Sequence, residues 1–143
     1  MNKELTVIGR AEEANFPKSG LFNVPVKIDT GAYRSSIWAT DIREEDGKLY
    51  YKLLGDSGVY NAGKEQETDV FEIVEVENSF GHSEERYSVY ITIEVAGRRV
   101  RSNFTLSDRS KKTYPVLIGR KLLRKKFIVD VSKGSPIPDE EKS

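Results

Sequence analysis

Apolar and polar positions alternate along much of the chain, and a spacing of two is typical of β-strands. The alternation is clearest over residues 70–76 and 87–95. The same kind of pattern predicts further strands at 5–8, 24–28, 49–54, 99–106 and 127–131. Because Gly97 separates two alternating runs, we expect a tight hairpin at that glycine.

Helix-forming sequence is confined to residues 119–126, directly before the last predicted strand. Residues 55–68 are polar and rich in glycine, and they predict a long loop. Residues 132–143 combine prolines with charges, which favours a flexible tail. We therefore predict an all-β fold with one short C-terminal helix, as a single domain over residues 1–131.

The composition removes several kinds of chemistry. The 143 residues include no Cys and one His, His82. A disulfide, a Cys-ligated zinc site and a Cys nucleophile are therefore excluded, and a His-pair metalloprotease motif cannot form within one chain. A Ser-His-Asp triad would have to use His82. A hydrolase of this composition would depend on carboxylates, hydroxyls or lysines.

The formal charge is zero, with 23 basic and 23 acidic side chains, but the charges are segregated along the chain. Residues 1–96 hold 10 basic and 18 acidic side chains, whereas residues 97–126 hold 11 basic and one acidic. A basic block can form a surface for nucleic acid or an acidic partner, or a solvated face matched to acidic surface elsewhere. We expect charge matching within the fold and no nucleic-acid partner.

The chain also lacks the sequence features of membrane insertion or export. No apolar run approaches the roughly 20 residues of a membrane span, and the first residues lack the apolar core of a signal peptide. We therefore expect a cytoplasmic protein without a membrane association.

The most informative local feature is Asp29-Thr30-Gly31-Ala32, directly after an apolar strand. Gly31 allows close backbone approach, Thr30 can hydrogen-bond across the turn, and Ala32 leaves room for a substrate backbone. Taken alone, the segment also fits an ordinary turn at the end of a strand, because Asp and Gly are common turn residues.

A second segment changes that interpretation. Two apolar residues, Leu117 and Ile118, precede Gly119-Arg120 and the predicted helix. Together the two segments, and the strands between them, resemble the paired signatures of retropepsin-type aspartic peptidases. The resemblance implies a closed β-barrel of the acid-protease kind and a catalytic Asp29. It also implies that the active-site loop is supported by Thr30, Gly31, Ala32, Leu117, Ile118, Gly119 and Arg120.

A narrower resemblance covers about residues 5–131. It is carried by residues 7–12, 27–32, 78–86, 104–109, 117–120 and 129–130. These segments resemble the bacterial and archaeal family labelled ATP-dependent zinc proteases, which is regarded as retropepsin-like and is often associated with ATP-grasp ligases. The resemblance therefore implies a functional link to an ATP-grasp ligase.

Two features depart from what these resemblances suggest. The chain has neither a recognisable set of zinc ligands nor a phosphate-binding loop of the Gly-x-x-x-x-Gly-Lys type, so we expect no metal and no cofactor. Retropepsins usually carry an acidic residue near the position of Tyr33-Arg34, which pairs with the arginine matching Arg120. The partner of Arg120 is therefore left open.

The mechanism implied by the resemblance needs two carboxylates that share one proton. The chain supplies one Asp-Thr-Gly, so we expect a homodimer in which two copies of Asp29 meet on a two-fold axis and hydrolyse an extended peptide. Two other functions stay open. One is a non-catalytic module that binds a peptide or an acidic partner, and the other is the metal-dependent peptidase that the family label suggests.

A retropepsin also needs a flap over its substrate. We place it in the polar turn at 77–83, with candidate contacts from Ser79, Phe80, Gly81 and His82; an ordinary hairpin tip is the alternative. Residues 55–63 form a competing flap candidate. His82 could touch substrate, bind a metal or simply be exposed.

Three further positions carry expectations. Trp38 is expected in the core just beyond the active-site loop. Asp108-Arg109 could form a structural ion pair or a substrate-contacting loop, and Asp130 is expected to pair with a basic residue such as Arg120 or Arg10.

Overall fold

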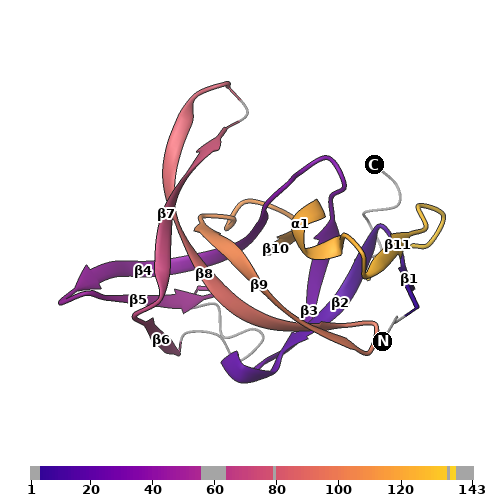
Figure 1. Ribbon diagram of the computed structural model, residues 1–143, viewed down its shortest axis with the longest axis horizontal. Coiled ribbons are helices and arrows are strands. Elements are labelled where there is room, and N and C mark those ends of the chain that lie inside the picture. The colour runs from indigo at the N-terminus through magenta and orange to yellow at the C-terminus, as the bar shows by residue number, and fades with distance from the viewer. Residues whose placement is uncertain (1–3, 56–63, 79, 135, 138–143) are drawn as a thin grey trace.

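The computed structural model describes residues 4–55, 64–78, 80–134 and 136–137, and strands dominate it (Figure 1). The strands are β1 (Thr6–Ile8), β2 (Ala11–Phe16), β3 (Leu21–Ile28), β4 (Ser35–Glu45), β5 (Lys48–Leu53), β6 (Glu65–Thr68), β7 (Phe71–Glu77), β8 (Ser83–Val95), β9 (Arg98–Ser107), β10 (Val116–Ile118) and β11 (Phe127–Val129). A 3₁₀ turn, η1 (Pro17–Ser19), and one short helix, α1 (Arg120–Leu123), complete the described residues. The predicted all-β class with one short helix is confirmed for this part of the chain.

The main sheet closes on itself. Its strands follow the order β10–β3–β2–β8–β9–β4, and β10 also pairs with β4, which completes a ring. β10 runs parallel to β3 and antiparallel to β4, so it lies between them. The parallel register sets Ile118 beside Ile28, one residue before Asp29. This ring is the closure that a barrel of the expected kind requires.

Apolar side chains from alternate strand positions fill the ring. Phe16 of β2 and Phe104 of β9 are fully buried and meet edge to face, with ring centroids 6.1 Å apart. Each such side chain contributes roughly 1.5–3 kcal/mol by leaving water. Trp38, expected in the core, is partly buried and packs against it. A side chain at Gly55 would come within 2.7 Å of the Trp38 ring, so the glycine permits this packing.

Two hairpins leave the ring in different ways. The β8–β9 hairpin turns through Ala96 and Gly97, whose φ angles of 52° and 75° are those of a two-residue turn, and the predicted hairpin is confirmed. The β7–β8 hairpin instead stands well away from the body of the molecule (Figure 1). The strands of this second hairpin line a cavity together with the candidate active-site loop described below.

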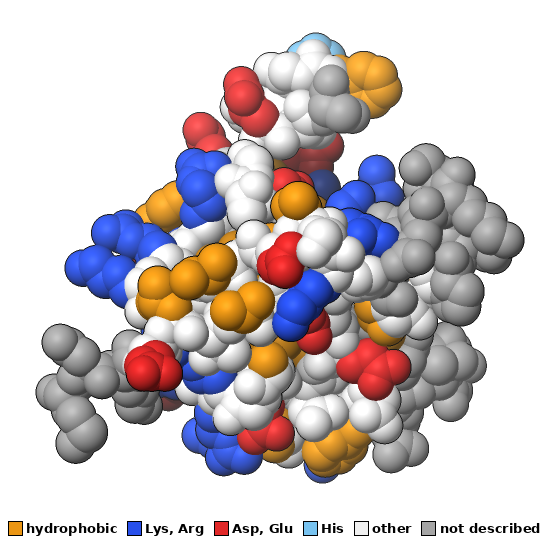
Figure 2. Space-filling view, turned by 90° about the vertical axis from the view of Figure 1, so that its right-hand side faces the viewer, with side chains coloured by type: hydrophobic (Ala, Val, Ile, Leu, Met, Phe, Trp, Pro, Cys, Tyr) orange, Lys and Arg blue, Asp and Glu red, His pale blue; other side chains and the backbone are white. Residues whose placement is uncertain are grey.

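A small parallel sheet of β1 and β11 lies apart from the ring. Val7 and Ile128 are register partners and are both about half exposed, so one face of this sheet carries apolar side chains. Figure 2 shows hydrophobic side chains gathered on this side of the molecule, below the projecting hairpin. No helix within the described residues is long and apolar enough to cross a membrane.

The predicted elements differ from the structure at several points. The sequence analysis did not predict the strands β2 and β4. The helix predicted over 119–126 stops at Leu123, because Arg124 is extended and Lys125 adopts a positive φ of 67°. Residues 65–68 of the predicted loop form β6, whereas 56–63, most of the competing flap candidate, lie outside the described residues. Residues 135 and 138–143 of the predicted tail also lie outside them, and its flexibility stays a prediction.

Candidate active site

Asp29 lies directly after β3, at the start of a tight loop. Its backbone N–H donates to the carbonyl of Ile118 at 2.8 Å, which extends the β3–β10 pairing by one residue. Its carboxylate Oδ1 accepts from Gly31 N at 2.9 Å, and its carbonyl accepts from Ala32 N at 3.2 Å. Asp29 is partly buried while Thr30 and Gly31 are exposed, so the loop presents the carboxylate at the protein surface.

The segment after β10 packs behind this loop. The buried hydroxyl of Ser35 accepts from Gly119 N at 3.0 Å. Arg120 N donates to Ala32 O at 2.8 Å, and Lys121 N donates to Tyr33 O at 3.0 Å. The structure thus joins the two predicted signature segments through backbone hydrogen bonds. The sequence analysis did not identify Ser35, because its partner Gly119 is 84 residues away in the sequence.

Gly119 is the closest point of this contact. A Cβ there would lie 2.5 Å from the carbonyl oxygen of Arg34 and 2.8 Å from that of Tyr33. Its φ of −97° is open to any residue, so the glycine is required by space and not by conformation.

The exposed side chain of Arg120 binds the Asp29 loop. Its Nη1 donates to the carbonyl of Thr30 at 3.1 Å, and its guanidinium lies over the ring of Tyr33, 5.9 Å from the centroid. A carbonyl and an aromatic face therefore occupy the role for which retropepsins usually supply a carboxylate.

Asp130 does not pair with Arg120, and that alternative in the sequence analysis is wrong. Its Oδ1 instead accepts from the hydroxyl and the N–H of Ser132, at 2.6 and 2.9 Å, and these bonds lower the pKa of Asp130. Arg10 donates through Nη1 to the carbonyls of Val131 and Lys133.

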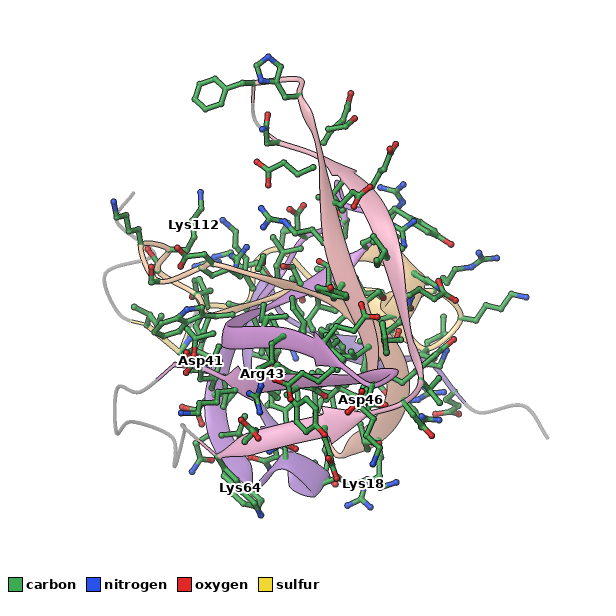
Figure 3. All side chains as sticks on the ribbon, turned by 90° about the vertical axis from the view of Figure 1, so that its left-hand side faces the viewer. Lys18, Asp41, Arg43, Asp46, Lys64 and Lys112 are labelled. Carbon is green, nitrogen blue, oxygen red and sulfur yellow. The ribbon has the colours of Figure 1, made fainter. Side chains whose placement is uncertain are left out.

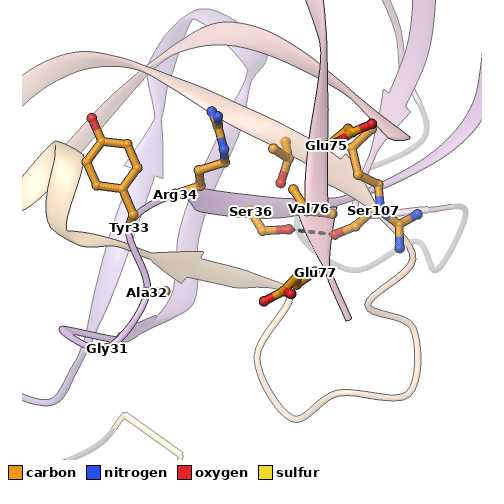
Figure 4. A pocket seen from close by; sticks show the side chains of 11 residues that line it. Gly31, Ala32, Tyr33, Arg34, Ser36, Glu75, Val76, Glu77 and Ser107 are labelled. Carbon is orange, nitrogen blue, oxygen red and sulfur yellow. Dashed lines mark hydrogen bonds between the residues drawn. The ribbon is translucent and has the colours of Figure 1, made fainter. Parts of the chain in front are cut away.

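A cavity of about 580 Å³ opens beside the Asp29 loop (Figure 4). One wall is the loop itself, residues 31–34, and the opposite wall comes from the β7–β8 hairpin. The hairpin supplies Glu75, Val76, Glu77 and Arg86. Ser36, Thr105 and Ser107 complete the lining, and the hydroxyls of Ser36 and Ser107 lie 2.5 Å apart. The cavity has the position that a substrate-binding cleft would need.

The predicted flap residues lie beyond this cavity, at the tip of the hairpin. Asn78 organises the tip, because its Oδ1 accepts from Phe80 N at 2.9 Å and from His82 N at 3.1 Å. Phe80 is 84% exposed, and Gly81 and His82 are exposed too. Ser79 lies outside the described residues. The cavity wall is thus built from the strands of the hairpin, whose facing residues the sequence alone did not identify.

The sequence analysis left open whether Arg109 forms an ion pair with Asp108. Its Nε donates to the carbonyl of the buried Tyr114 at 3.0 Å. Burial lowers the pKa of the Arg109 guanidinium, and the negative charge of Asp29 opposes that shift. Asp108 instead binds Ser110, whose side chain and then backbone N–H lower the pKa of Asp108. The two neighbours therefore form no ion pair with each other.

The described residues offer no cluster of three or more His, Cys, Asp or Glu side chains that could hold a metal ion. The described residues therefore do not fit the zinc that the family label suggests.

The chain matches a family of known proteins. A family model described as "Retropepsin-like aspartic endopeptidase RimB" matches residues 7–139. A probable alpha-L-glutamate ligase from Shewanella pealeana is 29% identical over 137 residues, which cover 93% of this chain and 30% of the ligase. A probable alpha-L-glutamate ligase from Desulfotalea psychrophila is 26% identical over 132 residues, 87% of this chain and 28% of the ligase. The chain thus spans less than a third of the length of these curated relatives.

A solved structure shares the fold. A Legionella pneumophila protein of unknown function superposes with a TM-score of 0.69 at 21% identity, covering 93% of this chain and 98% of that one. At this identity the match shows the fold alone.

Replacing Gly119 by alanine should destabilise the protein strongly, because the new Cβ would meet two backbone carbonyls that cannot rotate away. We expect a loss of roughly 3 kcal/mol or more in the free energy of unfolding, measured by urea denaturation. Gly81→Ala is the matched control, since its Cβ meets nothing within 4 Å and only its positive φ costs about 1–2 kcal/mol. Equal losses in the two variants would contradict the close approach at Gly119.

Proposed function

The chain belongs to the RimB-like family of retropepsin-like aspartic endopeptidases, and from that membership we propose that it hydrolyses peptide bonds as a homodimer, with one Asp29 from each chain. The loop geometry supports this proposal most directly. One Asp-Thr-Gly loop is pinned against the Gly119 segment, its tip is exposed, and a cavity opens beside it. A second copy could therefore approach the loop without prior unfolding.

In the proposed reaction the two Asp29 carboxylates share one proton, because two like charges about 3 Å apart cannot both ionise. The ionised carboxylate takes a proton from water, and the water oxygen attacks the scissile carbonyl carbon. The other carboxyl donates its proton to the carbonyl oxygen. Collapse of the tetrahedral intermediate breaks the C–N bond. The leaving nitrogen receives the proton that the first carboxylate took from water, and the hydroxyl formed from the carbonyl returns its proton to the second carboxylate.

The loop bonds described above give each carboxylate a defined position before substrate arrives. Gly31 N holds Oδ1 of Asp29, and Arg120 holds the carbonyl of Thr30. Such pre-organisation lowers the reorganisation needed in the transition state. An extended peptide would lie in the cavity between the loop and the β7–β8 hairpin, which would serve as the flap.

We propose further that the substrate carries acidic side chains. The relatives named probable alpha-L-glutamate ligases suggest that the substrate contains glutamate. They also suggest that this chain is functionally linked to a ligase, which the resemblance in the sequence analysis implies to be of the ATP-grasp kind. Arg34 lines the loop side of the cavity and makes no ion pair with any described residue. On the hairpin side Glu75 and Glu77 face the cavity, and the cation there, Arg86, is paired with Glu84. A substrate carboxylate would therefore be favoured next to the loop.

Asp29→Asn should abolish cleavage and leave the dimer intact, because the amide keeps the shape of the carboxylate but cannot take a proton from water. We expect the rate to fall by roughly 10²–10⁴-fold, with the dimer followed by analytical ultracentrifugation. Retained cleavage would contradict the proposal. Cleavage that survives Asp29→Asn but stops with a chelator would indicate a metal-dependent peptidase. Peptide binding with no cleavage by the wild type would indicate a binding module.

Arg34→Gln should discriminate against acidic substrates, because it removes the cation on the loop side of the cavity. For a glutamate-containing peptide we expect KM to rise about tenfold at nearly constant kcat, while a neutral peptide is cleaved as before. Lys18→Gln, which removes an exposed cation on the 3₁₀ turn, is the matched control. A similar change in KM for both peptides would argue against a role of Arg34 in selecting charge.

A further inference from the structure

A smaller cavity lies between Lys27, at the end of β3, and the loop that joins β9 to β10. Its volume is about 150 Å³, and its lining is unusually rich in cations. The lining residues are Lys27, Arg109, Lys112, Thr113 and Tyr114. We call it the cationic cleft. None of its residues lines the larger cavity beside the hairpin.

The cleft lies near the candidate catalytic carboxylate. Lys27 precedes Asp29 by two residues, and the negative charge of Asp29 acts on the guanidinium of Arg109. Lys112 comes from the loop that follows β9 and extends outward from it (Figure 3). The cleft is therefore formed where this loop folds back against the end of β3.

Arg109 distinguishes the cleft from an ordinary patch of solvated lysines. Its guanidinium is partly buried, and Nε is committed to the carbonyl of Tyr114, a side chain only 2% exposed. The burial lowers the pKa of Arg109, and the nearby charge of Asp29 offsets part of that cost. The Nη groups of Arg109 make no hydrogen bond to any described residue, so two planar donors stay available.

The residues that line the cleft include no acidic side chain that would pair with the three cations. Lys27, Arg109 and Lys112 form no ion pair within the part of the chain that the structure describes. Cations gathered around one small cavity create a local positive potential, which favours the entry of an anion.

We infer that the cationic cleft binds a single oxyanion group, a carboxylate or a phosphate, beside Asp29. The space equals the liquid volume of about five water molecules, which suits one such group with its remaining hydration. The fork of Arg109 matches the two oxygens of a carboxylate or phosphate. The lysines add charge, and the hydroxyl of Thr113 can add a hydrogen bond.

Anion binding and the charge of Asp29 should oppose each other. An oxyanion in the cleft would lie near the negative charge of Asp29, which already acts on Arg109, so the two negative charges would repel each other. Removing the charge of Asp29 should therefore strengthen anion binding. A surface patch remote from Asp29 would show no such coupling.

The test is an NMR titration of the full chain with inorganic phosphate at fixed ionic strength. We expect saturable shifts of the backbone amides around residues 27 and 109–114, with half-saturation in the low millimolar range. Arg109→Gln should weaken binding roughly tenfold, whereas Lys18→Gln, which lies far from Lys112 in Figure 3, should leave it unchanged. Shifts that never saturate, or equal weakening by the two variants, would overturn the inference.

Asp29→Asn supplies the second readout, and it needs no peptidase activity. We expect phosphate to bind about threefold tighter to this variant, and Asp46→Asn, in the distant β4–β5 turn, to bind as the wild type does. Unchanged or weaker binding by Asp29→Asn would overturn the placement of the anion beside Asp29.

A third arm separates the two sources of the oxyanion. A short neutral peptide with a free C-terminal carboxylate is compared with its C-terminal amide. Competition between the carboxylate peptide and phosphate would identify a peptide carboxylate as an occupant, and binding of phosphate alone would identify a free anion. Either result supports the site, and saturable binding of neither would overturn it.

Discussion

The position of β10 between β3 and β4 is the constraint on which the rest of the site depends. Three residues pair with two neighbouring strands at once, and they thereby close the ring and bring Ile118 to the backbone of Asp29. The contact is so close that the next residue has no room for a side chain, which explains Gly119. The Asp29 loop is consequently fixed by backbone hydrogen bonds and not by its own side chains alone.

Arginines of the basic segment, residues 97–126, have a structural role. Arg98 donates to the carbonyls of Glu4 and Lys126, Arg109 to that of Tyr114, and Arg120 to that of Thr30. Each arginine thus joins segments through backbone acceptors. Two of them, Arg109 and Arg120, also bring positive charge near the Asp29 loop, which sets the electrostatic surroundings of the proposed reaction.

Much of this arrangement could be predicted from sequence, for identifiable reasons. The alternation of apolar and polar residues predicts strands such as β8, and the glycine predicts the Ala96–Gly97 turn. β4 was missed because its outer half is charged and its strand carries a positive φ at Asp41. The support from Ser35, the hairpin wall at Glu75–Glu77 and the field of Asp29 at Arg109 were missed because each joins positions distant in sequence. The resemblance to retropepsins located the loop but could not supply the partner of Arg120.

The central claim is that one active site contains Asp29 from two chains, and a mixing experiment tests it most directly. Wild-type chain is held at constant concentration while Asp29→Asn chain is added under conditions where subunits exchange, and peptide cleavage is measured. Activity should fall as inactive mixed dimers form, because in an equal mixture roughly a quarter of the dimers keep both aspartates. Cleavage that stays constant, in proportion to the wild-type chain alone, would contradict a shared site.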